Sequence, residues 1–387
     1  MPRPITFNNI KILLDNREYF QYNSITCSHI VNQGIALKSA IVDASITYQN
    51  YISFSIDMAD KQVMLASLEI DNKIFLQGFV NLKMISTEVS NNNLRISFTI
   101  NERFFPLTSS DIVKTLFLKG HGTLQILFAC ILKELDFLKY NNYPKKINTV
   151  MDFIKNGLNV KDIRLTQNIV KYGDHEQAIH IINEGCNIYK VLLNSNGYDT
   201  LFVEKYNSYV DPIYQINLLF DKKNLNPSFG NISSARKIGN DNDDASRIII
   251  LNPSINRKKP KIADKHTSLI VNYEKGLPNI QRIMSINRQV SYNGLKDAIN
   301  QSLIGLNASA NSYTYQLSDT IFDVNGDFFK PNRYIFVKDE LHLINDKMTI
   351  VGISFSIDAT AGVNTTFNLS FAESFYDNVN AKHKKQL

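Results

Sequence analysis

Residues 348–375, MTIVGISFSIDATAGVNTTFNLSFAESF, carry the pattern that indicates the fold most clearly. Apolar side chains alternate with Ser, Thr or Asn on both sides of the loop 358–362. The apolar positions are Ile353, Phe355, Ile357, Phe367, Leu369 and Phe371, and the polar ones are Ser354, Ser356, Thr366, Asn368 and Ser370. A period of two on either side of a glycine-containing loop predicts an antiparallel hairpin with one buried and one polar face. The stretch contains no catalytic motif.

The length and composition bound the class of protein. At 387 residues the chain exceeds the size at which a single core stops growing, which predicts two to four domains. Its 44% hydrophobic and 20% charged residues are ordinary for a folded globular protein. The longest strongly apolar run, residues 126–132, is far shorter than the roughly 18 residues of a membrane span. The first residues lack a signal-peptide pattern, so Sec-type export is not expected.

Cysteine usage and net charge indicate the redox compartment and the charge of expected partners. Cys27, Cys130 and Cys186 are far apart, odd in number and without a CxxC pair. Neither a zinc site nor a disulfide framework is therefore expected, and folding in a reducing cytoplasm fits best. The net charge of +6 favours acidic partners without identifying one.

The first hundred residues predict a succession of short strands. Hairpins are expected at 11–19, turning at Asp15-Asn16, at 67–80, turning at Asp71-Asn72, and at 89–100, turning at three successive asparagines. In the last of these, one face carries Leu94, Ile96, Phe98 and Ile100. The alternation of Ile52, Phe54 and Ile56 predicts a further strand at 52–58. The spacing predicts a small antiparallel barrel or sandwich that ends near residues 103–106.

The apolar period then changes to three and four residues. Residues 122–137 predict a helix whose apolar face comprises Leu124, Leu127, Phe128, Ile131, Leu132 and Leu135. A second helix is predicted from Asp174, in a capping box with Gln177, to a stop at Gly185. Residues 187–205 predict a hairpin around Asn196-Gly197. Residues 108–221 are therefore expected to form a mixed α+β unit.

Strand character returns in the last part of the chain. Residues 234–251 and everything from Tyr313 onward predict strands, separated by a basic loop at 256–266 and a helix at 291–306. No repeat of 20 to 50 residues is visible. The predicted fold class is α+β and predominantly antiparallel β, with two β-rich units flanking a mixed middle.

No catalytic, cofactor-binding or metal-binding residue is predicted. The histidines are scattered and expected to be structural or exposed: His29, His121, His175, His180, His266, His342 and His383. The segment DNDDA at 241–245 departs from a calcium loop and is interpreted as a polar turn. P-loop, GxGxxG, GxSxG and HExxH motifs are absent, and KGHG at 119–122 is interpreted as a loop. The chain is not expected to be an enzyme, although a carboxylate pair for glycoside hydrolysis stays open.

A basic cluster has the highest local density of positive charge in the sequence. Its members are Arg257, Lys258, Lys259, Lys261 and Lys265. The cluster suits phosphate binding, but a solvated loop is the simpler interpretation, because Pro260 and the charges resist burial. The Phe and Tyr residues fall at strand spacing, which favours core positions over stacking on bases.

The order of these elements resembles the baseplate hub protein of contractile-tailed, Mu-like bacteriophages. The same architecture occurs in larger hubs of other myophages and in the first part of type VI secretion spike proteins. Four stretches carry the resemblance: 12–35, 120–137, 173–205 and, most closely, 328–375 with its Pro-Asn pair, closing hairpin and terminal Phe. Phe329 stands where the family often has Trp, and the segment 256–266 has no counterpart.

The resemblance implies a domain plan. Two small tail-tube-like β-barrels are expected, the first at 1–107 and the second, discontinuous, at 222–255 and 310–376. They would flank a mixed middle domain at 108–221, with an insertion at 256–309 and a flexible tail at 377–387. The polar positions Ser354, Ser356, Thr366 and Asn368 would then face a neighbouring subunit or a wet lumen.

The resemblance also implies a function. Three chains would form a ring that adapts a six-fold tail tube to a three-fold spike and surrounds part of the DNA-delivery channel. The expected partners are tube or tube-initiator proteins, the central spike, other baseplate proteins and DNA in transit, with no membrane span and no cofactor. The expected location is the tail baseplate of a phage, prophage or gene transfer agent, after assembly in the bacterial cytoplasm. The alternatives are a tail-associated cell-wall hydrolase and a host-surface binding module.

Overall fold

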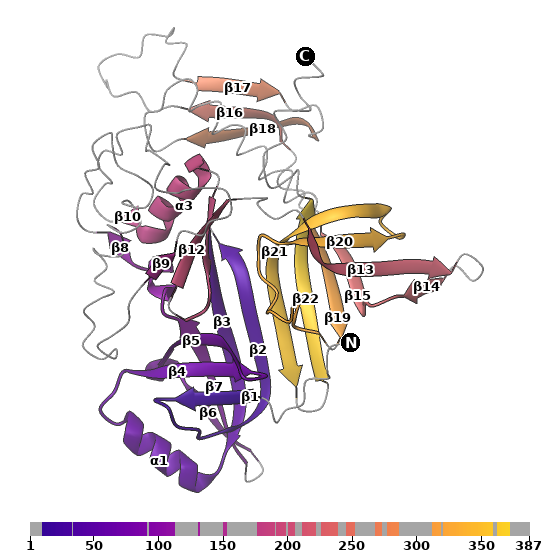
Figure 1. Ribbon diagram of the computed structural model, residues 1–387. Helices are drawn as coiled ribbons and strands as arrows, with labels where there is room; N and C mark the ends of the chain where they lie inside the picture. Colours follow the sequence, from indigo (N-terminus) through magenta and orange to yellow (C-terminus); the bar gives the residue numbers. More distant parts are fainter. Residues whose placement is uncertain are drawn as a thin grey trace, which may run out of the picture.

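In the computed structural model, strands that pair mainly antiparallel make up most of the described residues, which confirms the predicted predominance of antiparallel β-structure (Figure 1). Two α-helices have described bounds, α1 (Tyr48–Met58) and α3 (Ala178–Tyr189). The structure describes residues 10–32, 34–90, 93–112, 131, 150–152, 176–189, 191–198, 200–205, 211–221, 226–238, 245–251, 268–272, 277–285, 312–318, 320–358 and 362–371.

The N-terminal strands pair in what we call the first arc. These are β1 (Ile10–Leu14), β2 (Gln21–Asn32), β3 (Ile35–Ile46), β4 (Val63–Ile70), β5 (Lys73–Asn81), β6 (Ser86–Ser90) and β7 (Asn93–Glu102). The pairings run β1–β4–β5–β7–β3–β2, and β6 lies beside β7. Asp71 and Asn72 turn β4 into β5 with φ angles of 53° and 58°, a conformation that Asp and Asn tolerate. The predicted hairpins at 67–80 and 89–100 are confirmed.

The prediction of a hairpin at 11–19 is correct for its turn and wrong for its pairing. Asp15 and Asn16 have φ angles of 47° and 66°, but only one bridge joins Leu14 to Arg17, and β1 pairs with β4. The turn itself is tied to β4, because the Asp15 N–H donates to the Leu65 carbonyl at 2.8 Å and the Asp15 carboxylate accepts from the Leu65 N–H at 2.9 Å.

The strand predicted at 52–58 is wrong, because these residues lie in helix α1. Thr47 caps the helix by accepting from the Asn50 N–H. Phe54 is fully buried and Tyr51 and Met58 pack beside it, at spacings of three and four residues, whereas Ile52 and Ile56 are exposed. Burial of the apolar side chains at helical spacing therefore decides the structure of this segment, although its sequence also alternates like a strand.

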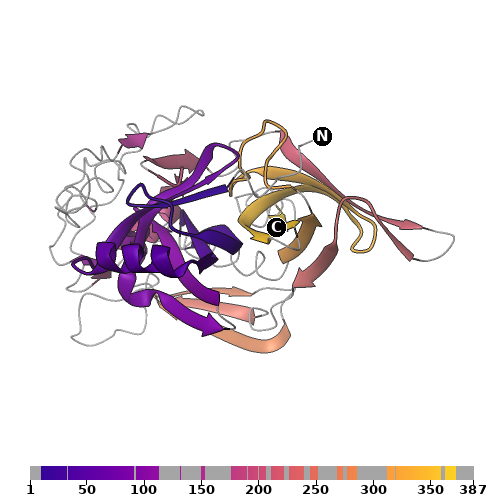
Figure 2. The same ribbon diagram turned by 90° about the horizontal axis from the view of Figure 1, so that it is seen from below.

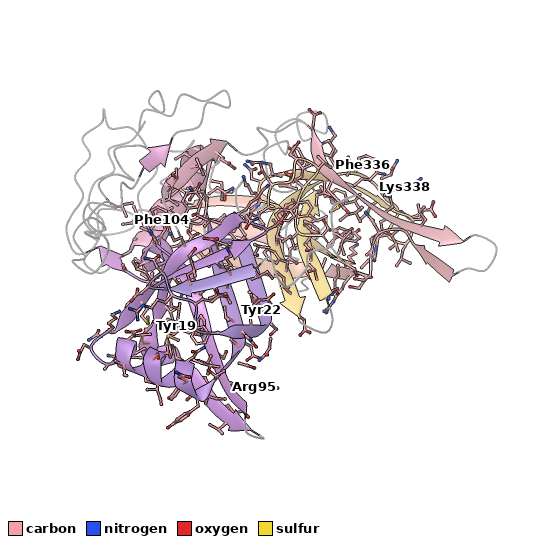
Figure 3. All side chains as sticks on the ribbon, turned by 60° about the horizontal axis from the view of Figure 1, so that its bottom comes forward. Tyr19, Tyr22, Arg95, Phe104, Phe336 and Lys338 are labelled. Atoms are coloured by element: carbon pink, nitrogen blue, oxygen red, sulfur yellow. The ribbon has the colours of Figure 1, made fainter. Side chains whose placement is uncertain are left out.

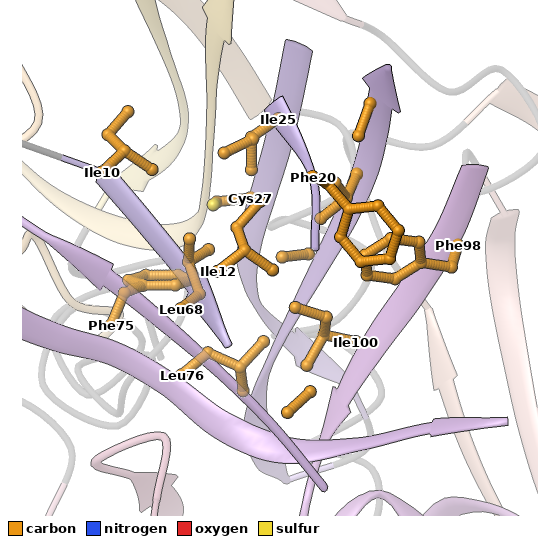
Figure 4. Close-up of a cluster of buried hydrophobic side chains, with 14 of the residues drawn as sticks. Ile10, Ile12, Phe20, Ile25, Cys27, Leu68, Phe75, Leu76, Phe98 and Ile100 are labelled. Atoms are coloured by element: carbon orange, nitrogen blue, oxygen red, sulfur yellow. The ribbon is translucent and has the colours of Figure 1, made fainter. Parts of the chain in front are cut away.

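A core of aliphatic and aromatic side chains fills the first arc (Figure 4). Phe20 lies in the middle of an aromatic group, with ring centroids 5.2 Å from Phe54 and 5.4 Å from Phe98. Phe328 and Phe355, from the other end of the chain, belong to the same cluster and contact Phe75. The first core is therefore completed by C-terminal residues.

The middle of the chain contributes short elements beside the first arc. These are the 3-10 helix η3 (Phe105–Thr108) and the elements β8 (Asp111–Ile112), β9 (Val150–Asp152), β10 (Glu176–Gln177), α3, β11 (Val191–Ser195) and β12 (Thr200–Lys205). The predicted hairpin around Asn196-Gly197 is confirmed for 191–205, with φ of 92° at Gly197, whereas residues 187–189 of the predicted range lie in α3. Ile131 is helical and buried, whereas the rest of the predicted helix 122–137 lies outside the described residues.

The capping box predicted for the second helix is wrong. Gln177 pairs with Asp111 in a two-stranded ladder, and the helix begins at Ala178. It also continues past Gly185 to Tyr189, because Cys186 is buried on its apolar face. Burial of this face outweighs the roughly 1 kcal/mol that a glycine costs inside a helix.

The C-terminal strands form what we call the second arc. These are β13 (Pro212–Asp221), β14 (Asn226–Phe229), β15 (Ser234–Ile238), β19 (Ser312–Ser318), β20 (Tyr334–Asp339), β21 (Ile344–Asp358) and β22 (Gly362–Phe371). They pair in the order β15–β19–β22–β21–β20–β13–β14 around a second core. The closing hairpin predicted from the sequence is confirmed as β21–β22. Seen from below, the two arcs lie side by side (Figure 2).

A separate three-stranded sheet consists of β16 (Ala245–Leu251), β17 (Ser268–Asn272) and β18 (Leu277–Ser285). The predicted helix 291–306 and the basic loop 256–266 lie outside the described residues. Among the described residues, the pairings do not close either arc into a ring of strands. The two barrels and the domain boundaries therefore stay predictions.

Candidate functional site

The two arcs are joined into one continuous sheet by a pairing between β2 and β21. Seven residue pairs connect these strands, from Ser24 opposite Asp358 to Ile30 opposite Gly352. The joined sheet, which we call the wall, runs β6–β7–β3–β2–β21–β22–β19–β15. Every neighbouring pair in it is antiparallel. Strands that are hundreds of residues apart in sequence thus form a single surface.

One face of the wall buries both cores, and the opposite face, which we call the polar face, carries hydroxyl and amide side chains. One row crosses seven strands through residues that lie opposite one another: Asn101, Ser39, Ser28, Ser354, Thr366, Gln316 and Ser234. The next row comprises Thr99, Ile41, Thr26, Ser356, Asn364 and Ser318. Ser354, Ser356, Thr366 and Asn368 are half-buried and alternate with buried neighbours along β21 and β22, as the period of two predicts. That they face a neighbouring subunit or a lumen stays a prediction.

Neighbouring polar side chains bond to one another in the first row and in the adjacent row that contains Asn368. The hydroxyl oxygens of Ser28 and Ser39 lie 2.7 Å apart, and the Thr314 hydroxyl donates to Asn368 Oδ1 at 3.1 Å. The Ser234 hydroxyl likewise donates to Gln316 Oε1 at 3.1 Å. Such contacts tie strands together without introducing charge. The alternation ends at Ser370, which is buried rather than exposed as predicted.

Charged side chains lie toward the margins of the polar face. Asp43 and Asp358 both lie opposite Ser24, beyond one end of the two uncharged rows. Arg95 lies on β7 and Arg236 on β15, near the two lateral edges of the wall. Figure 3 shows Arg95 at the far end of the first arc, while Phe336 and Lys338 lie on β20 at the other side of the molecule. The two central rows are therefore uncharged and mostly polar, with the exposed Ile41 among them and the exposed Ile30 in the row beside them.

Behind the wall, a group of buried charges connects the first arc to the β11–β12 hairpin. Lys38 is 3% exposed and donates to the carbonyls of Phe75 at 3.0 Å and Asn196 at 2.8 Å. Glu102 is fully buried and accepts from the backbone N–H of Lys38 at 2.9 Å. We call Lys38, Glu102 and the turn at Asn196-Gly197 the charged junction. Its groups are enclosed by backbone, so it acts as a tie and presents no reactive atom to solvent.

The charged junction shifts both of its titratable groups toward neutrality. Burial lowers the pKa of Lys38 to about 8, against the attraction of Glu102. Burial raises the pKa of Glu102 to about 7, against the hydrogen bond from the Lys38 backbone. Burial also lowers the pKa of the neighbouring His29 well below its ordinary value. The fold therefore tolerates charge here only at an energetic cost.

Glu102→Gln is expected to flatten the dependence of stability on pH. The folded carboxyl, with a pKa of about 7 rather than 4.5, holds its proton longer than the unfolded one as the pH rises. The stability that this proton contributes is present below pH 4.5 and is lost as the pH rises through 7. The buried His29, whose pKa is lowered, changes stability in the opposite sense within this window. Urea unfolding of both the wild type and the variant at both ends of the window therefore measures the contribution of Glu102 as their difference. An equal loss in the Glu102→Gln variant would contradict the assignment to Glu102.

Sequence reasoning missed the charged junction, although a signal was present. On β3 the inward positions are Ala36, Lys38, Ala40, Val42 and Ala44, and on β7 they are Ile96, Phe98, Ile100 and Glu102. A charge at an inward position of an alternating strand requires a partner. Applying the period of two to these strands would therefore have found both residues.

Two further ties lie in the second arc. Arg333 bonds both carboxylate oxygens of Glu204, at 3.0 and 3.1 Å, and joins β12 to the segment before β20. The buried Asp339 accepts from the Tyr315 hydroxyl at 2.7 Å, and one of its oxygens lies 2.6 Å from His342 Nδ1. Asp339 and His342 thus order the end of β20 and the turn that follows it.

The other residues considered from the sequence do not converge. His29 is buried in the first arc, His180 lies on α3 and His342 in the second arc. The remaining four histidines, the loop 119–122 and the polar turn at 241–244 lie outside the described residues. Within the described ranges, no three His, Cys, Asp or Glu side chains group as metal ligands. In the same ranges, no helix has the length and apolar character that crossing a membrane demands.

Solved structures of phage-type tail proteins share this fold. A 43 kDa tail protein of prophage MuSo2 from Shewanella oneidensis matches with a TM-score of 0.71, over 95% of this chain and 99% of that one, at 14% identity. The tail protein from Neisseria meningitidis MC58 matches with a TM-score of 0.68, over 95% and 97% of the two chains, at 11% identity. The resemblance drawn from the sequence is thus confirmed at the level of fold.

A secretion-system protein shares the fold more distantly. An E. coli component of the type VI secretion system, described as structurally similar to the T4 tail proteins gp27 and gp5, matches with a TM-score of 0.50. The match covers 95% of this chain and 78% of that one, at 9% identity. No protein-family model and no curated protein sequence matches this chain.

Proposed function

We propose that this protein is a structural hub of a phage-type tail, in which three copies form a ring and the polar faces of their walls line the channel. The ring adapts a six-fold tube to a three-fold spike, and DNA passes through it. The role is mechanical rather than catalytic. The observation that carries the proposal is the fusion of two similar arcs into one wall by the β2–β21 pairing.

The wall suits this role because one chain contributes two arcs to it. Three chains with two arcs each present six similar units, which match a six-fold tube on one side. The three chains themselves match a three-fold spike on the other side. The full-length likeness to the Shewanella and Neisseria tail proteins supports the same placement in a tail. The buried cores then lie on the outer side of the ring, and the polar rows face the channel.

The chemistry of the polar face suits the passage of a polyanion. Lysine and arginine side chains bind phosphates and release counterions, so a basic lining would retain DNA. A dense acidic lining would repel it. The two central rows contain hydroxyl, amide and one apolar side chain, which neither hold nor exclude a phosphate backbone strongly.

Placing lysine at Ser39 and Thr366 is expected to lower DNA delivery per assembled particle on the order of tenfold, since the added cations bind passing phosphates. The two positions lie in one row and are separated by Ser28 and Ser354, so the new charges do not touch. The matched control places glutamine at the same two positions, with similar length and no charge.

The measurement compares particle yield by electron microscopy with the amount of DNA delivered. The proposal expects normal particle yield for both variants and reduced delivery for the lysine variant alone. Equal delivery by both variants would place the polar face away from the DNA path.

A further inference from the structure

On one side the wall branches at β7, where β5 pairs with residues 100–102 and β6 with residues 93–97, and on the other side it ends at β15. Both β6 and β15 have one edge that is unused among the described residues. Among the described residues, β6 pairs with β7 alone and β15 pairs with β19 alone. Both strands are five residues long. Ser86, Thr87, Glu88 and Val89 of β6 all have solvent-accessible side chains, as do Arg236 and Lys237 of β15. A flat, exposed edge strand offers unpaired backbone groups to another chain.

The directions of the two edges are compatible with each other. The wall has eight strands, and each neighbouring pair is antiparallel, so β15 runs opposite to β6. A second copy rotated about a ring axis brings its β6 beside β15 of the first copy in an antiparallel arrangement. Head-to-tail contacts of this kind close into rings when the rotation fits.

The side chains select one register. With the two strands fully overlapped, Glu88 lies opposite Arg236, Val89 opposite Ala235 and Ser90 opposite Ser234. The faces agree, because Glu88 lies opposite the exposed Arg95 and Arg236 opposite Thr314, both on the polar face. A carboxylate then lies between two guanidinium groups, and opposite charges across strands stabilise a pair by about 0.2–1 kcal/mol.

The same register gives an ordinary strand tilt. The perpendicular row that starts at Ser234 crosses the wall and reaches Asn101 on β7. Ser90 lies opposite Asn93, eight residues before Asn101. On passing from one chain to the next, across eight strands, the perpendicular row is therefore displaced by eight residues along the strand direction. An eight-stranded barrel with a shear of eight has the same ratio of displacement to strand number, and its strands tilt by about 36° from the barrel axis. Closed rings of strands commonly have this tilt.

We infer that β6 of one copy pairs antiparallel with β15 of the next, with Glu88 opposite Arg236, so that the wall continues from chain to chain. This inference rests on the proposed ring and identifies its subunit contact. The partner of each edge is a second copy of this chain, and the two strands SARKI and STEVS form the joint.

The test is a covalent joint between copies. A chain carrying Glu88→Cys and Arg236→Cys is treated at micromolar concentration with a short bifunctional thiol reagent and analysed by denaturing electrophoresis. The inference expects conversion of most of the protein to covalent trimers. Both positions are exposed, so folding is retained, and the native Cys27 and Cys186 are buried. The wild-type chain, treated with the same reagent, gives the background.

The matched control pairs Val89→Cys with Arg236→Cys, which places the two thiols on opposite faces of the joint and is expected to give at least tenfold less trimer. Light scattering on the same samples measures the oligomeric state independently of cross-linking, so a wrong joint can be told from the absence of a ring. Trimers in solution that yield no covalent product from the Glu88→Cys, Arg236→Cys chain would overturn this joint and leave the ring in place. Monomers in every sample would overturn the joint and the proposed ring together.

Discussion

Replacing Arg333 by methionine is expected to lower the free energy of unfolding by about 3–5 kcal/mol. The guanidinium makes two bonds to Glu204, whose side chain is only 5% exposed. Removal of the cation leaves a carboxylate in a site that water reaches poorly, and desolvation of an uncompensated charge is expensive. The change also removes the ion pair between β12 and the segment before β20, and leaves the longer bond from Asn332 Nδ2 to Glu204 at 3.4 Å. Urea denaturation measures the change.

Two further variants identify the cause of the loss. Arg333→Lys keeps the charge but lacks the planar fork, so a smaller loss is expected. Adding Glu204→Gln to Arg333→Met removes the buried charge, and part of the stability is expected to return. A loss below about 1 kcal/mol for Arg333→Met would show that the pair behaves like an exposed ion pair.

Gly78→Ala is expected to destabilise the first arc by about 3 kcal/mol or more. A Cβ atom at this position would overlap the carbonyl oxygen of Asn101 and lie 2.7 Å from the Cα atom of Glu102. Both atoms belong to the backbone of β7, so β5 and β7 must separate where they pair. The roughly 0.4–1 kcal/mol that alanine gains by restricting the unfolded chain cannot offset this strain.

Gly352→Ala in β21 is the matched control. Its Cβ atom would approach the side chain of Ile30 at 3.2 Å, and a side chain can move where a backbone cannot. We expect a loss below about 1 kcal/mol for this variant. Equal melting temperatures for Gly78→Ala and the wild type would contradict the described contact between β5 and β7.

Local turn chemistry explains which parts of the fold were predictable. Asp71-Asn72 and Asn196-Gly197 favour positive φ angles and connect strands that are adjacent in sequence, so their hairpins follow from short stretches. The polar face of β21 and β22 could equally be predicted from the sequence, because a period of two specifies which side chains share a face.

Contacts between distant segments explain the rest. The pairing of β1 with β4 depends on the hydrogen bonds between Asp15 and Leu65. The connection of the two arcs depends on the pairing of β2 with β21, which begins with Ser24 opposite Asp358. Nothing in either local stretch specifies its partner. In helix α1, alternation and helical spacing coexist within one short segment, and packing of Phe54 against the Tyr19 and Phe20 rings decides between them.

The proposed function requires that three copies of this chain close into a ring. The most direct test is electron microscopy of the purified protein at micromolar concentration, with class averages of single particles. Rings with threefold symmetry, an open centre and the size of three chains are expected. Compact particles with the size of one chain and no central opening would contradict the proposed function.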